Sequence, residues 1–182
     1  MINDRAVKGF TLIELLIVMG LLAIVLSAVY GLLANANMNR ASQDRVVELQ
    51  QNVRFAADFV TREFKASSTI ACLENTTTPC LTAGDKITFT SVTDAQTRIF
   101  SWSSTDHILQ FSISSGAPNR QPLADNITEF TVTPYDSSNN VTTNVSSIKR
   151  IDVTITGRTA VIDPVSKSYR TYSVTASAIK RN

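Results

Sequence analysis

Two hydrophobic periods divide the chain into a helical part and an alternating part. From Phe10 to Ala34 nearly every position is apolar, and Glu14 is the single charged residue of that run. A helix over this run would reach about 37 Å, which exceeds the roughly 30 Å of hydrocarbon in a bilayer. The pattern therefore predicts a membrane-spanning helix over residues 10–34.

The helical signal continues through residues 35–66, which contain neither proline nor glycine. Apolar side chains recur there at steps of three and four residues and form one stripe: Val46, Leu49, Val53, Ala56, Val60 and Phe64. Such a stripe is typical of an amphipathic helix that packs on a core. We expect opposite charges four residues apart to pair on the wetter side, at Arg40/Asp44, Arg54/Asp58 and Asp58/Arg62.

Two features bear on whether the two helical segments form one helix. Residues 35–45 are polar nearly all round, so their intrinsic helicity is weaker, and Gly20 and Gly31 are candidate points of bending. An uninterrupted helix from Phe10 to Ala66 would be about 85 Å long.

From Ser67 onward apolar residues alternate with polar ones, which is the period of half-buried β-strands. The alternating groups are Ile87/Phe89, Leu109/Phe111/Ile113, Phe130/Val132, Ile151/Val153/Ile155 and Tyr172/Val174/Ala176/Ala178, with Arg98–Ser103 as a further candidate. Turn-rich breaks separate them at 115–119, 136–140 and 163–164. Short breaks and one polar face favour an antiparallel sheet. The predicted fold class is α+β, a long N-terminal helix packed on an antiparallel β-sheet domain over residues 67–182.

Charge predicts the orientation in the membrane. Arg5 and Lys8 precede the apolar run, and the next positive charge is Arg40. The positive-inside rule then places the N-terminus in the cytoplasm and the rest outside, as a single-pass protein of the inner membrane. The chain holds 17 Lys and Arg against 15 Asp and Glu, so there is no basic excess typical of nucleic-acid binding. We expect no nucleic-acid partner, with weak contact through a local patch left open.

A cleaved secretory signal is the alternative to a retained anchor. Ala34-Asn35-Ala36 resembles an A-x-A cleavage site. Ordinary signal h-regions run about 7–15 residues, whereas this apolar run is much longer and contains a glutamate. The anchor is therefore favoured over cleavage after Ala36.

The two cysteines, Cys72 and Cys80, both fall on the predicted exported side. An oxidising compartment favours a disulfide between them. A metal pair is the weaker alternative, because the spacing is not C-x-x-C and the single histidine, His107, lies far beyond Cys80. We expect a disulfide and no metal site.

Catalytic signals are weak along the whole chain. A Ser-His-Asp set would need His107, which follows Asp106 in a predicted hairpin turn. The sequence has no P-loop and no GxGxxG motif. Residues 135–144 are rich in oxygen ligands, yet their acidic density is low, so a polar hairpin is favoured over a calcium site near Asp136. We predict no enzyme and no cofactor.

The prediction of a membrane-spanning helix does not explain Glu14, the single charged residue of the apolar run. A charged side chain at the centre of a bilayer costs about 2.5–3.5 kcal/mol on translocon-derived scales. Glu14 lies near the cytoplasmic end of the run, where it costs less. This cost alone leaves two interpretations of Glu14 open. It is either a residue without a function at the edge of the membrane, or a residue whose charge is paired by a partner protein.

The stretch GFTLIE at residues 9–14, after a leader that contains Arg5 and Lys8, resembles the class III, prepilin-type N-terminal motif of type IV pilins and pseudopilins. The resemblance covers residues 7–34. It implies that a prepilin peptidase cuts between Gly9 and Phe10, which makes residues 1–9 a leader peptide, and methylates the new terminus. It also implies that Glu14 neutralises the Phe10 amine of an adjacent subunit, a pairing that low dielectric strengthens.

A narrower resemblance concerns the post-membrane helix. Residues 48–66, with Gln50, Arg54 and Ala56, are similar to PilW-like minor pilins, and the strand at 148–159 also resembles the J-type minor pseudopilins of type II secretion. Gly31 stands where many major pilins carry proline. The cysteine pair follows the helix and does not lie near the C-terminus, where major pilins often place theirs. Both departures favour a minor subunit over a major one.

The family resemblance therefore implies a minor pilin of a type IV pilus. Such a subunit has a structural role: it joins other pilins in a helix bundle, in the filament or its tip and priming complex. Its expected partners are the prepilin peptidase and the inner-membrane assembly platform, and its final location is a periplasmic or cell-surface filament. The alternatives are a minor pseudopilin of a type II secretion system and, in a different class, an unassembled membrane-anchored periplasmic binding module.

Overall fold

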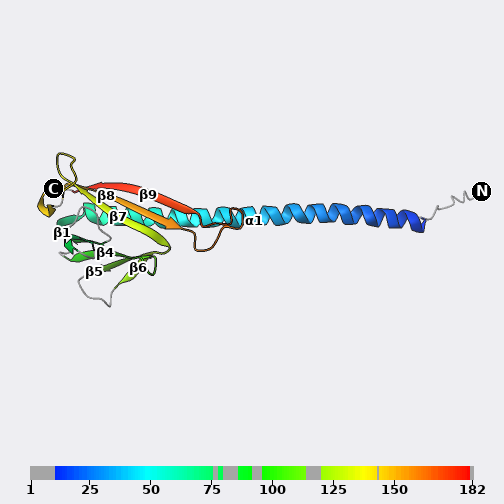
Figure 1. The fold of residues 1–182 in the computed structure, drawn as a ribbon, viewed down its shortest axis with the longest axis horizontal. Coiled ribbons are helices and arrows are strands. Elements are labelled where there is room, and N and C mark those ends of the chain that lie inside the picture. Colours follow the sequence, from blue (N-terminus) through cyan, green and yellow to red (C-terminus); the bar gives the residue numbers. More distant parts are fainter. Residues whose placement is uncertain are drawn as a thin grey trace, which may run out of the picture.

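The computed structural model describes residues 11–75, 78–79, 86–91, 96–113, 120–142 and 144–180. Within these residues one long helix, α1 (Leu12–Lys65), is followed by strands and a short 3-10 turn, η2 (Val145–Ser147). The strands are β1 (Ser67–Asn75), β2 (Thr78–Pro79), β3 (Lys86–Ser91), β4 (Thr97–Ser103), β5 (Ile108–Ile113), β6 (Gln121–Ala124), β7 (Ile127–Tyr135), β8 (Arg150–Arg158) and β9 (Thr171–Ile179). Figure 1 shows the helix projecting far beyond the strands. The predicted α+β fold is confirmed.

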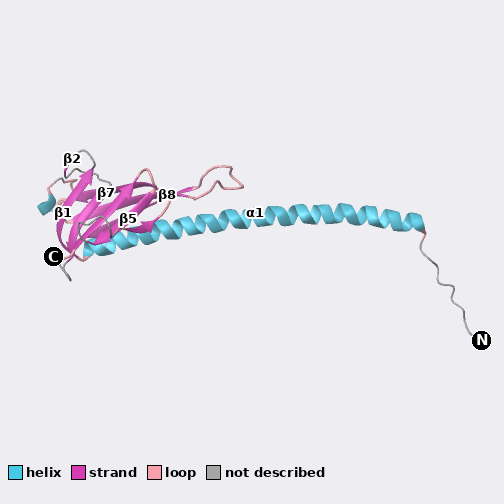
Figure 2. Ribbon diagram, turned by 90° about the horizontal axis from the view of Figure 1, so that it is seen from below, coloured by secondary structure: helices cyan, strands magenta, loops and turns pink. Residues whose placement is uncertain are grey.

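Helix α1 runs without interruption over 54 residues. It passes through Gly20 and Gly31 and through the polar stretch 35–45, so the predicted weakness there does not break it. Figure 2 shows a gently curved rod whose last turns lie against the strands. The helix ends at Lys65, and Ala66 caps it by donating its N–H to the carbonyl of Arg62 at 3.2 Å. The membrane-spanning and domain-packing segments predicted from the sequence are thus parts of one helix.

The strands form two antiparallel sheets where the sequence predicted one. The first has the order β2-β1-β3-β4-β5-β6, and the second has the order β7-β8-β9. Asn126, between β6 and β7, adopts a left-handed φ of 59° that turns the chain out of the first sheet. The sheets meet where Trp102 Nε1 donates to the carbonyl of Ile127 at 3.0 Å and Ile127 N donates to the carbonyl of His107 at 2.8 Å.

Strands β1, β2 and β6 were absent from the list predicted by alternation. β1 has no sustained period of two, and β6 is short and contains Pro122. The remaining predicted strands are present, and their register keeps the alternation: Phe130 lies opposite Ile155, and Val132 lies opposite Val153.

The core lies between the domain half of α1 and the two sheets. The predicted helix stripe is buried at Leu49, Val53, Ala56, Val60 and Phe64, while Val46 is only half-buried. Phenylalanine rings extend the core across the first sheet, with ring centroids 6.4 Å apart for Phe64–Phe89, 5.6 Å for Phe89–Phe100 and 5.0 Å for Phe100–Phe111. This aromatic chain carries the packing from α1 to β5.

Gly157 of β8 sets how closely α1 approaches the second sheet. A Cβ at this position would lie 2.8 Å from Val53 Cγ2 and 2.9 Å from Leu49 Cδ1. Real Cβ atoms do not pack at such distances, so glycine is what lets the helix rest directly on the strand.

The predicted charge pairs along α1 are not among the ion pairs found in the described part of the chain. Arg54 Nε donates instead to the Tyr172 hydroxyl of β9 at 3.1 Å. Glu63 pairs with Arg98 of β4 at 3.3 Å. Polar side chains of the helix therefore reach across to strands, because the sheets lie close enough to compete with the next helical turn.

Candidate assembly helix and its attachment to the domain

The N-terminal half of α1 touches nothing else in the described structure. Every large apolar side chain from Leu12 to Leu33 is exposed, for example Leu12 at 82% and Tyr30 at 76%. Figure 1 shows this half extending away from both sheets. By length and composition α1 is suited to cross a membrane. An apolar surface of this extent needs lipid or other apolar helices around it.

Glu14 lies in the first turn of this bare half. Its backbone N–H donates to Thr11 Oγ1 at 3.3 Å, which makes Thr11 the N-cap of α1. The sequence Thr-x-x-Glu is that of a capping box, in which Glu or Gln is preferred three residues after the cap. The positive end of the helix dipole also favours a carboxylate there. Glu14 therefore has a local role available besides the predicted pairing with a neighbour.

Gly9 and Phe10, the predicted processing site, lie outside the described residues. Cleavage between them, and the role of the Phe10 amine in assembly, stay predictions. What the structure describes is the capped first turn that directly follows them, with Glu14 exposed on it.

Residues 4–30 match the family model for the prokaryotic N-terminal methylation motif. The match spans residues 4–9 of the predicted leader, the predicted cut and most of the bare apolar half of α1. No curated protein matches the chain. The prepilin-type motif implies processing by a prepilin peptidase and assembly with other pilins. With the apolar helix it supports a membrane-anchored, type IV pilin-like or pseudopilin-like protein. The narrower PilW-like and J-type resemblances stay predictions.

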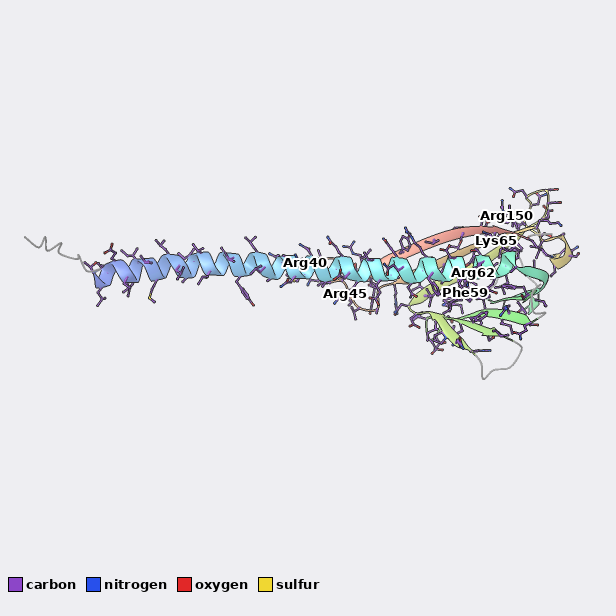
Figure 3. The ribbon with its side chains drawn as sticks, turned by 180° about the vertical axis from the view of Figure 1, so that it is seen from behind. Arg40, Arg45, Phe59, Arg62, Lys65 and Arg150 are labelled. Atoms are coloured by element: carbon purple, nitrogen blue, oxygen red, sulfur yellow. The ribbon has the colours of Figure 1, made fainter. Side chains whose placement is uncertain are left out.

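A second feature ties α1 to the domain where the bare half ends. The loop between β8 and β9, residues 159–170, lies against α1 at Ser42 and Arg45, and we call it the β8–β9 loop. Figure 3 labels Arg45 where this loop meets the helix. Arg45 Nη1 donates to the carbonyl of Ile162 at 3.1 Å.

Asp163 is the centre of this contact and is fully buried. Its Oδ2 accepts a hydrogen bond from Ser42 Oγ and lies 3.6 Å from Arg170 Nε. Its Oδ1 accepts from the backbone N–H groups of Val165 at 2.8 Å and Ser166 at 2.7 Å. The carboxylate therefore closes its own loop and holds that loop on the helix.

The Ser42 hydroxyl, followed by the Ser166 N–H, holds the pKa of Asp163 well below its usual range. Burial opposes this shift, but the donors outweigh it. Asp163 is therefore ionised at neutral pH. The sequence pattern predicts only a turn at residues 163–164 and does not reveal this role of Asp163.

The other candidates from the sequence have local structural roles. His107 lies in the β4–β5 turn as predicted, and the neighbouring Asp106 accepts from Ser103 Oγ at 2.8 Å. Asp136 Oδ1 accepts from the N–H groups of Ser138 at 2.8 Å and Asn140 at 2.9 Å, so this carboxylate caps its own hairpin. Among the described residues no group of three His, Cys, Asp or Glu side chains is placed to hold a metal ion.

The predicted disulfide falls partly outside the described chain. Cys72 belongs to β1 and its backbone lies opposite Thr88 of β3, but Cys80 is not among the described residues. The bridge between Cys72 and Cys80 stays a prediction.

Proposed function

We propose that this protein is a minor pilin of a type IV pilus, a structural subunit that enters the filament or its tip and priming complex through α1. The observation that carries the proposal is the bare apolar half of α1, which bears the prepilin-type motif and continues unbroken into the folded domain. A lone membrane anchor needs an apolar helix, but it has no need of a processing motif at its start.

The proposed mechanism is polymerisation. Before assembly the apolar half of α1 lies in the inner membrane with the N-terminus in the cytoplasm. On assembly it leaves lipid and packs among the equivalent helices of neighbouring pilins. Lipid tails and apolar side chains are similar environments, so this exchange has little hydrophobic driving force of its own. Polar contacts between helices then decide which helix docks and at what height.

Glu14 supplies such a contact in this proposal. Cleavage between Gly9 and Phe10 creates an amine four residues before Glu14. In a helix bundle that excludes water, an ammonium and a carboxylate attract each other far more strongly than in water. A neighbour's Phe10 amine would therefore offset the cost of keeping Glu14 in an apolar helix. The cap seen in the structure joins the backbone N–H of Glu14 to Thr11 Oγ1 and leaves the Glu14 side chain exposed.

Two other functions are consistent with the same motif and helix. A minor pseudopilin of a type II secretion system would use α1 in the same way, and the surrounding genes, a pilus operon or a secretion operon, distinguish the two. An anchored periplasmic module that never assembles belongs to a different class and requires no cut at Gly9.

The test of the proposed function combines location with processing. We expect the protein in filaments or tip complexes sheared from cells, and N-terminal sequencing of that material should begin at a methylated Phe10. Protein that stays in the membrane fraction and begins at Met1 would contradict the proposal that it is a pilin. A start at Asn37 would instead indicate a secretory signal cut after Ala36.

A further inference from the structure

Strand β9 is an edge strand of the three-stranded sheet and is nine residues long. Figures 1 and 3 show it at the outer margin of the domain, running beside α1. The side chains of its inner face, Tyr172, Val174 and Ala176, are half-buried against the core. The side chains of its outer face are exposed.

The hydrogen bonds that frame β9 decide which backbone groups are free. Thr159 N donates to Arg170 O, and Lys180 N donates to Lys149 O, each at 2.8 Å. Residues that bond to the partner strand alternate along an antiparallel ladder. Even-numbered residues of β9 therefore direct N–H and C=O at β8. Odd-numbered residues direct theirs away from the sheet, and we find no partner for these groups in the described part of the chain: Thr171, Ser173, Thr175, Ser177 and Ile179.

This edge lacks the features by which proteins protect open strands. Edge strand β2 is two residues long, and edge strand β6 is four residues long and contains Pro122. β9 has no charged residue and no proline, and its register with β8 runs without a bulge from Thr171 to Ile179. Short length, charge, proline and bulges are the usual protections, and an edge without them is a template for another strand.

We propose that the β9 edge binds an extended segment of a different exported protein by β-strand addition when the subunit is assembled. This inference rests on the assembly function proposed above and names the surface that meets a neighbour outside the helix bundle. Five outward backbone positions are enough for a strand of ordinary length, and backbone hydrogen bonds are the main source of affinity in this mode.

The membrane anchor excludes an antiparallel pair of two β9 strands. β9 runs in the same direction as α1, away from the bare apolar half (Figure 1). Copies held in one membrane therefore have parallel β9 strands, and two of these strands cannot form an antiparallel twofold pair. Among the occupants that remain, we assign this edge to a segment of another chain. β9 is uncharged along its length and is followed by Lys180, so the matching segment is uncharged with a carboxylate at the end that meets Lys180.

A proline at residue 175 tests the outward edge of β9 without disturbing its backbone pairing with β8. Thr175→Pro removes an outward N–H but no backbone hydrogen bond to β8, whereas Ala176→Pro removes a backbone bond within the sheet. Thr175→Pro also removes the side-chain hydrogen bond between Thr175 Oγ1 and Thr154 Oγ1 of β8 at 2.9 Å, which Thr175→Ala removes as well. Thr175→Ala keeps every N–H and controls for the side chain. In full-length protein purified in detergent, we expect Thr175→Pro and Thr175→Ala to unfold close to the parent temperature, and Ala176→Pro to unfold earlier.

Hydrogen exchange then measures the added strand. We expect the amides of Ser173, Thr175 and Ser177 to exchange at least about tenfold more slowly in the assembled fraction than in the isolated protein, because they gain hydrogen bonds. Thr175→Ala should show the same protection. Thr175→Pro should lose protection at Ser173 and Ser177 and be depleted from the assembled fraction.

Equal exchange of these amides in assembled and isolated parent would overturn the inference and leave the proposed function intact. Absence of the chain from every assembled fraction would contradict the proposed function and this inference together. A photoreactive residue at Ser177 identifies the neighbour: an adduct with an acid-ended segment of another exported protein supports the inference, and an adduct with β9 of a second copy overturns it.

Discussion

Ser42 of the long helix donates a hydrogen bond to the buried carboxylate of Asp163, 121 positions further along the chain. The contact closes the domain at the point where α1 leaves it. Residues 35–45 are weak helix formers, so the bound loop supplies order that their own propensity does not. With Arg45 on the carbonyl of Ile162, it fixes two successive turns of α1 to the second sheet.

Removing this carboxylate should release the β8–β9 loop. Asp163→Asn keeps the shape but loses the charge that faces Arg170, and it places an amide N–H₂ group where oxygen accepts. We expect faster hydrogen exchange and faster proteolysis in residues 159–170, with a lower unfolding temperature. Ser42→Ala should give the same change to a smaller degree, because the Val165 and Ser166 donors remain. Unchanged exchange in both variants would contradict the role of this contact.

The Asp163 carboxylate should also make the stability of the fold depend on pH. Because the folded state holds the pKa of Asp163 below its usual value near 4, the carboxylate adds stability that is complete above that value and is lost as pH falls below it. The stability difference between parent and Asp163→Asn should therefore shrink as pH falls from about 4 to about 2. Thermal unfolding of both proteins across that range measures it. A difference that stays constant would rule out the ionised state.

Gly157 should be intolerant of a single methyl group. Gly157→Ala brings Cβ against Val53 and Leu49, so α1 must move away from β8 or these side chains must leave their rotamers. Overpacking of this kind costs typically about 1–3 kcal/mol, which chemical unfolding resolves. Gly31→Ala is the matched control, because nothing lies within 4 Å of its Cβ position. We expect Gly31→Ala to leave domain stability unchanged, and a double variant with Val53→Ala to recover part of the loss.

The sequence predicted those parts of the fold that depend on local patterns. The period of α1 gives its buried face, and strict alternation gives β3, β5, β7, β8 and β9. The split into two sheets was missed because it depends on one left-handed residue, Asn126, and on which strand pairs with which. Strand β6 was missed because a proline at an edge hides the period.

The contact between the β8–β9 loop and α1 shows why contacts between residues far apart in the chain are not predicted from local sequence patterns. An aspartate before proline and three residues before Ser166 predicts a turn closed by its own carboxylate. Nothing near it in sequence names Ser42 as the further donor. The N-terminal site differs: Thr11 and Glu14 are close in sequence, so the capping of the Glu14 N–H by Thr11 can be predicted from it. The partner proposed for the Glu14 carboxylate is on another molecule, which one sequence does not reveal.

Variants of Glu14 separate capping from charge pairing. Glu14→Ala removes the cost of the carboxylate in lipid, so membrane insertion should be no worse. If Glu14 meets a neighbour's Phe10 amine, its loss leaves a buried charge unpaired, which typically costs about 3–5 kcal/mol. Even half of that lowers incorporation more than tenfold, since each 1.4 kcal/mol is about a factor of ten. We expect normal membrane levels and poor recovery in sheared filament fractions.

Glu14→Gln is the decisive comparison. Glutamine keeps the capping pattern but carries no charge. We expect it to assemble nearly as poorly as alanine. Assembly of Glu14→Gln at the parent level, with Glu14→Ala impaired, would assign Glu14 to the capping of α1 instead. Normal assembly of both variants would make Glu14 dispensable.

Cys72 and Cys80 should be bridged in the exported protein. Thiol labelling of unreduced, denatured protein is expected to find no free thiol, and labelling after reduction should find two. A short loop closed by such a bridge contributes roughly 2.5 kcal/mol if strain is low, so Cys80→Ser should lower the midpoint of chemical unfolding. Two labelled thiols without reduction would refute the bridge.

Because α1 is uninterrupted, the orientation of its bare apolar half in the proposed helix bundle fixes the orientation of the domain. Each residue turns a helix by about 100° and advances it by about 1.5 Å. Between the bare apolar half and the first contact of the loop at Ser42 there is no hinge that could absorb a change of phase. One alanine inserted in residues 35–41 would therefore leave both ends folded, yet it would rotate the β9 edge by about 100° about the axis of α1. Four inserted residues, about one full turn, would nearly restore its azimuth. The sequence of this segment is thus free to vary while its length is not.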